Sequence, residues 1–285
     1  MGYRTERIFV LTAIVVVGLA LVLAVSRGAV GTGGADAEPL LWVMTLVLAL
    51  VASAGALWVA QGGEAPEDRL TLGRLWILPV PLEVLLPGLL AVGFVLFLRL
   101  FESGIAQVVV LALAAASFGA VYWGQAHGSN TKDPYFGLAQ TSLNVAAHVG
   151  AFLLFTTIYG LKVRSLYSAS ATGVVAFLLV YELLSRDAAW HKAMSLPVEG
   201  RRSTVALLSL VAGLVVGELT WGLNYWAALT TLIGGAFLLV VFYVTHGVLS
   251  HYVDHTLDRR LLVEFGVVAG VGIVAVFGSA FLIGE

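Results

Sequence analysis

Residues 245–260, THGVLSHYVDHTLDRR, concentrate groups that could do chemistry. This stretch holds three of the six histidines in the chain, two aspartates four residues apart and a double arginine. Four of these residues are spaced by three and four positions: His251, Asp254, His255 and Asp258. On a continuing helix these four would share one face, and His246 would lie on another. Two imidazoles and two carboxylates on one face predict a candidate site for a divalent metal ion.

The same stretch permits other interpretations. Asp254 and Asp258 have the DxxxD spacing that suits magnesium and a diphosphate, but the sequence lacks a second acidic motif to complete such a site. It also lacks the HExxH pattern of zinc proteases. We therefore interpret the stretch as the solvated end of a helix, anchored by Arg259 and Arg260 and without a bound cofactor. A metal-dependent site and a partner-docking surface are the alternatives.

Other polar residues lie inside long apolar runs, where ionisable groups are costly and usually face the interior of a helical bundle. By expected depth they form three layers. The cytoplasmic layer contains Glu83, Glu182, His246 and Glu264, the middle layer Asn144 and His148, and the outer layer Arg99 and Glu218. We predict that Glu83, Asn144, His148, Glu182 and His246 line a path for a ligand or an ion.

Two pairs in these layers each have a structural alternative. Arg99 and Glu218 could form an ion pair across the bundle, or each could reach the outer interface separately. Asn144 and His148 are one helical turn apart and could relay protons or contact a ligand. They could equally make the hydrogen bonds that join helices in membranes.

The elements that would position these residues are apolar stretches of about 20 residues, the length that crosses the hydrocarbon core as a helix. Nine are expected, at residues 8–26, 39–61, 78–98, 105–125, 137–160, 166–185, 203–224, 228–250 and 261–283. No connection between them is long enough for a soluble domain. The sequence therefore predicts an all-α integral membrane protein, with residues 1–285 forming a single polytopic bundle.

Composition supports this class and excludes others. Of the 285 residues, 60% are hydrophobic and 11% are charged, far from the usage of soluble domains. The formal net charge of -2 offers no basic surface for binding nucleic acid. The chain has no cysteine, which excludes disulfides and thiolate chemistry.

The distribution of Lys and Arg predicts the orientation, because positive loops stay in the cytoplasm. With a cytoplasmic N-terminus, eleven of the 15 basic residues lie inside: Arg4, Arg7, Arg69, Arg74, Lys132, Arg186, Lys192, Arg201, Arg202, Arg259 and Arg260. We expect a protein of the cell membrane with the N-terminus inside, the C-terminus outside and an uncleaved first helix.

Two GxxxG spacings, Gly213/Gly217 and Gly266/Gly270, predict close helix packing, either within the chain or with a second copy or membrane partner. Three functions stay open on these observations. The preferred hypothesis is a membrane protein that binds or transports a small or lipidic ligand through a polar-lined interior. The alternatives are an enzyme acting on lipid head groups through the 251–258 stripe, and a non-catalytic scaffold or accessory subunit.

Overall fold

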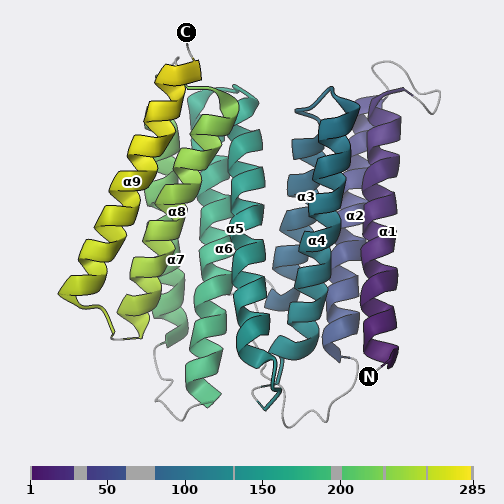
Figure 1. Cartoon of the computed structure of the whole chain (residues 1–285), viewed down its shortest axis with the longest axis horizontal. Coiled ribbons are helices and arrows are strands. Elements are labelled where there is room, and N and C mark those ends of the chain that lie inside the picture. The colour runs from purple at the N-terminus through teal and green to yellow at the C-terminus, as the bar shows by residue number, and fades with distance from the viewer. Residues whose placement is uncertain are drawn as a thin grey trace. The chain divides into compact units, whose positions relative to one another are not determined.

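The computed structural model describes residues 2–28, 37–61, 81–130, 132–193, 201–226, 229–254 and 256–283 (Figure 1). Within them it contains nine α-helices: α1 (Gly2–Ser26), α2 (Ala37–Gln61), α3 (Leu85–Leu98), α4 (Gly104–Gly128), α5 (Phe136–Gly160), α6 (Ser165–Ala193), α7 (Arg201–Leu223), α8 (Thr231–Val253) and α9 (Arg259–Ile283). Eight are long and apolar enough to cross a membrane. The prediction of an all-α polytopic membrane protein is confirmed.

The third predicted span is the short one. Pro81 precedes a 3-10 turn, η2 (Leu82–Val84), which leads directly into α3. Proline lacks a backbone N–H and has a fixed φ, so it favours the start of a helix over its interior; Pro87 lies in the first turn of α3. The continuous apolar segment is Leu82–Leu98, and the expected start at residue 78 lies outside the described residues.

The described helices group into two compact units, 1–150 and 151–285. In the first unit, α1, α2, α3 and α4 pack on one another through apolar side chains. Phe94 of α3 and Phe118 of α4 have ring centroids 6.0 Å apart. The buried Tyr122 hydroxyl of α4 donates a hydrogen bond of 3.2 Å to the Ala52 carbonyl of α2. Aromatic packing and one polar bond therefore join three helices of this unit.

The second unit contains the remainder of α5 with α6, α7, α8 and α9. Glycines of α8 lie directly against α5, because a Cβ at Gly235 would overlap Thr156. The rings of Phe155 in α5 and Phe242 in α8 meet edge to face, with centroids 5.7 Å apart. α9 packs along α8, and none of the residues in its membrane-crossing window is buried. Most of the surface of α9 is thus free to meet lipid.

Candidate functional site

Helices α6 and α7 of the second unit pack closely along a line of small residues. A Cβ added at Gly173 would lie 2.9 Å from the Gly213 carbonyl oxygen, and one added at Gly217 would lie 3.0 Å from the Ala169 carbonyl oxygen. Side chains larger than hydrogen would therefore push the two backbones apart. The residues Gly213 and Gly217 pack within the chain, against α6.

Hydrogen bonds hold the same two helices in one register. The Thr172 hydroxyl of α6 donates to the Thr220 hydroxyl of α7 over a distance of 2.8 Å, and both side chains are buried. Near the end of α7, the Asn224 amide donates to the Ser168 hydroxyl, also at 2.8 Å. These bonds and the glycine contacts join α6 and α7 along most of their shared length.

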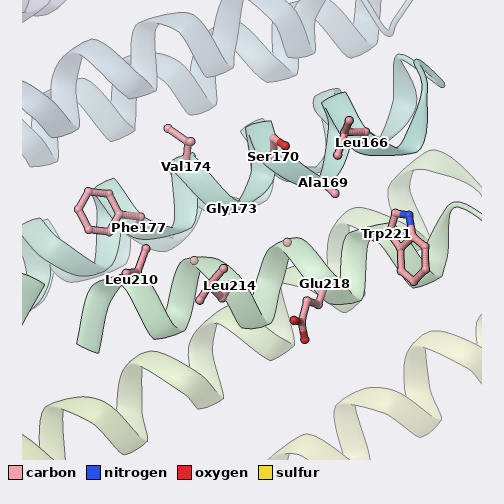
Figure 2. Close-up of a pocket in the computed structure, with 12 residues that line it drawn as sticks. Leu166, Ala169, Ser170, Gly173, Val174, Phe177, Leu210, Leu214, Glu218 and Trp221 are labelled. Atoms are coloured by element: carbon pink, nitrogen blue, oxygen red, sulfur yellow. The ribbon is translucent and has the colours of Figure 1, made fainter. Parts of the chain in front are cut away.

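Small residues along this contact leave a groove between the exposed side chains of the two helices, which we call the α6–α7 groove (Figure 2). Its volume is about 590 Å³, within the range of about 300–1,000 Å³ that is typical of ligand pockets. The groove is lined by Leu166, Ala169, Ser170, Gly173, Val174 and Phe177 of α6, and by Leu210, Gly213, Leu214, Gly217, Glu218 and Trp221 of α7. Its walls are apolar apart from Ser170 and Glu218.

Glu218 is the charged residue of this groove. It follows Leu210 and Leu214 along α7 and precedes Trp221 by one turn (Figure 2). Its side chain is exposed and makes no hydrogen bond or ion pair with another described residue of the second unit. An apolar channel with one carboxylate near its end can accommodate a hydrocarbon chain and contact a polar head group.

The predicted partner of Glu218, Arg99, lies in the first unit at the end of α3. There its guanidinium binds the Glu38 carboxylate of α2, with Nη2 3.1 Å from Oε2 and Nη1 3.3 Å from Oε1. Both side chains are partly exposed, as expected near an interface. The Arg99–Glu218 pair stays a prediction. Glu38 was not among the predicted partners of Arg99, because a separation of 61 residues gives no local signal.

The candidates of the ligand path fall in both units. In the first, Glu83 is half-buried on η2, and its backbone carbonyl accepts a hydrogen bond from Gln125 at 3.2 Å. On α5, His148 Nδ1 lies 2.8 Å from the Asn144 carbonyl oxygen, so one ring nitrogen is engaged by the helix's own backbone. The backbone carbonyl of Glu83 and one ring nitrogen of His148 are therefore engaged in local structure.

In the second unit, Glu182 belongs to a buried ion pair. The Arg186 guanidinium donates to Glu182 Oε1 from Nη2 at 2.6 Å and from Nε at 3.2 Å, and the two side chains are 6% and 2% exposed. One residue further along α6, Asp187 accepts a hydrogen bond of 2.8 Å from Ser250 of α8. His246 is buried on α8, with its ring stacked on Phe242. This end of α6 and α8 is a polar cluster within the apolar unit.

The expected arrangement of the 251–258 stripe is wrong. Helix α8 ends at Val253 with Asp254 as its C-cap, and α9 begins at Arg259, so Asp254 and Asp258 do not continue the helical face of His251. His251 Nδ1 lies 2.8 Å from the Thr256 hydroxyl, and Asp258 accepts a hydrogen bond of 2.8 Å from the Leu261 N–H at the start of α9. These side chains thus hold the turn between two helices.

His255 lies outside the described residues. Among those that are described, no group of three or more His, Asp or Glu side chains is placed to hold a metal ion. Glu264, the other acidic residue considered near this stripe, forms an exposed pair with Arg260 on α9, at 3.1 Å. A Cβ added at Gly266 or Gly270 would meet no atom within 4 Å, and self-association through them stays a prediction.

The α6–α7 groove was not predicted from the sequence. A signal was available in α6, where Ala169 and Gly173 are four residues apart and match the spacing of Gly213 and Gly217. Pairing these two small-residue motifs would have predicted the contact between α6 and α7. The groove alongside it depends on neighbouring side chains from both helices, which neither motif specifies.

Residues 37–278 match the model of one protein family, described as "Protein of unknown function (DUF5656)". The match covers most of the chain and includes all residues of the α6–α7 groove. No curated protein and no solved structure matches the chain.

Proposed function

We propose that this chain, which belongs to the DUF5656 family, binds a lipidic ligand in the α6–α7 groove. The observation that carries the proposal is the combination of an apolar groove of about 590 Å³ with a carboxylate at its edge. Ligand sites in proteins are mostly apolar, with a few polar groups that orient the ligand. A hydrocarbon chain lying along Leu214 and Val174 would place a head group near Glu218.

Packing explains why lipid would stay in this groove longer than on a smooth helix surface. The groove lies on a pair of helices held together by glycine contacts and buried hydrogen bonds, so its shape is established before a ligand arrives. A preformed groove avoids the cost of ordering the protein on binding. An acyl chain bound in the groove would contact two helices at once and gain more dispersion contacts than an acyl chain lying on a single helix.

Transport would extend this function by a second step, in which the bound ligand moves between the groove and the polar interior. We retain Glu83, Asn144, His148, Glu182 and His246 as candidates for that path.

The test fills the groove with a bulky side chain. Val174 lines the groove and is 58% exposed, and Val267 on α9 has the same exposure but lies outside the groove. A phospholipid with a photoreactive acyl chain is reconstituted with the full chain, and labelled peptides are measured by mass spectrometry. We expect Val174→Trp to reduce labelling of α6 and α7 about fivefold and Val267→Trp to leave it unchanged, because tryptophan occupies space that the acyl chain needs. Labelling spread evenly over all helices, and insensitive to Val174→Trp, would contradict the proposal.

A further inference from the structure

A carboxylate and two aromatic rings follow one another where the α6–α7 groove reaches the end of α7. Glu218, Trp221 and Tyr225 are spaced by three and four residues, which places them successively along one side of α7 and the turn after it. The rings of Trp221 and Tyr225 meet edge to face, with centroids 5.4 Å apart and an interplanar angle of 81°. We call these three residues the acidic–aromatic stripe.

All three side chains of the acidic–aromatic stripe are accessible. Trp221 is 52% exposed, Tyr225 is 71% exposed, and Glu218 forms no ion pair with a described cationic side chain of its own unit. A carboxylate near the membrane interface is stabilised by a cationic partner, and an aromatic face attracts the same kind of group. The stripe therefore suits an ammonium group better than a phosphate or a neutral sugar.

A positive residue lies near the same end of the helix pair. Ala169 of α6 contacts Gly217 of α7, and the two helices are antiparallel. Arg164, five residues before Ala169, therefore lies at a depth similar to that of Gly222, five residues after Gly217. Arg164 is exposed just before the first residue of α6. Its guanidinium suits a phosphate, whereas Glu218 suits an ammonium group. Together they complement a zwitterionic head group.

We propose that the lipid bound in the α6–α7 groove is a phospholipid with a primary ammonium head group, held by Glu218 and Trp221. This inference rests on the proposed lipid-binding function and adds the identity of the head group. A primary ammonium donates charge-assisted hydrogen bonds to the Glu218 carboxylate and also contacts the face of Trp221. A quaternary ammonium has no N–H to donate, and a glycerol head group has no positive charge.

The experiment compares three lipids that share dioleoyl chains: phosphatidylethanolamine, phosphatidylcholine and phosphatidylglycerol. Native mass spectrometry of the full chain in detergent gives a dissociation constant for each. We expect phosphatidylethanolamine to bind about tenfold more tightly than phosphatidylglycerol, the effect of one charge-assisted contact. In Glu218→Gln the dissociation constants of these two lipids should differ by no more than about twofold. Trp221→Leu should raise the dissociation constant of phosphatidylethanolamine by roughly threefold.

The matched control is Glu102→Gln, which neutralises an exposed carboxylate in the connection between α3 and α4 and should leave the lipid preference unchanged. Equal binding of the three lipids, or an unchanged preference in Glu218→Gln, would overturn the head-group inference and leave the stripe as an interfacial anchor. A separate arm uses Val174→Trp, which should weaken all three lipids alike. If Val174→Trp weakens none of them, the proposed function itself fails.

Discussion

Two ion pairs of the same composition, each between an arginine and a glutamate, differ in their burial. Glu182 and Arg186 are almost fully buried on α6, whereas Arg260 and Glu264 on α9 have side chains 86% and 56% exposed. Both pairs are spaced by four residues on one helix. Removing one member of a buried pair leaves a charge without compensation, whereas an exposed charge is solvated either way.

We predict that Arg186→Leu destabilises the protein by about 3 kcal/mol or more, because it leaves the Glu182 carboxylate buried without its guanidinium. The double variant Glu182→Leu/Arg186→Leu should recover at least about 1 kcal/mol of that loss, since no charge is then left buried. The measurement is the free energy of unfolding in mixed micelles, for each single variant and the double variant.

The Arg260 and Glu264 pair is the control for this cycle. Its coupling energy should be no more than about 0.5 kcal/mol, because solvent screens both charges. Additive effects at Glu182 and Arg186, as small as those at the exposed pair, would show that the buried pair does not act as a unit.

At the scale of helices, glycine positions determine which pairs approach closely. A Cβ at Gly213 would lie 2.7 Å from the Gly173 carbonyl oxygen and 3.1 Å from the Phe177 Cβ, so α7 would have to move away from α6. At Gly270 on α9 a Cβ would meet nothing within 4 Å. The same GxxxG spacing therefore has a packing role in one helix, and in the other its glycines make no close contact with the part of the chain that the structure describes.

We predict that Gly213→Ala costs about 1–3 kcal/mol of unfolding free energy, the usual cost of overpacking a close contact. Gly270→Ala should be neutral or slightly stabilising, because alanine has the higher helix propensity and the space is open. The measurement is unfolding by titration with sodium dodecyl sulfate, followed by circular dichroism. Equal costs at the two positions would mean that helix flexibility, and not the contact with Gly173, determines the effect.

Whether the two termini lie on the same side of the membrane or on opposite sides depends on whether α3 crosses it. Its apolar segment, Leu82–Leu98, spans roughly 25 Å at 1.5 Å per residue, close to the lower limit for a crossing helix. We propose that it crosses, because basic residues then gather on one side, with the N-terminus inside and the C-terminus outside.

The check on this prediction uses reporter fusions in two connections. A reporter placed after residue 103, between α3 and α4, should report the outside, and one in the connection between α6 and α7 should report the inside. Both termini on one side of the membrane, with a reporter after residue 103 inside, would show that α3 does not cross. The outward-facing end of the α6–α7 groove would then change sides as well.

The sequence by itself determined the helices and the class of the protein. An apolar run long enough to cross lipid must satisfy its backbone hydrogen bonds internally, so it forms a helix whatever surrounds it. The long helices overlap the expected stretches, although α1 already begins at Gly2 and α6 runs on to Ala193. The exception is α3, which begins at Leu85 after the 3-10 turn that follows Pro81, an effect of proline that hydrophobicity alone does not measure.

Only the tertiary structure decided which residues meet. Arg99 binds Glu38, Gly213 packs on Gly173, and α8 ends at Val253 before the predicted stripe is complete. In soluble proteins an apolar stripe marks the buried face of a helix, but in a membrane both the lipid-facing and the protein-facing sides are apolar. Sequence periodicity therefore does not say which side packs, and the groove that carries the proposed function arises from contacts between residues about 40 positions apart.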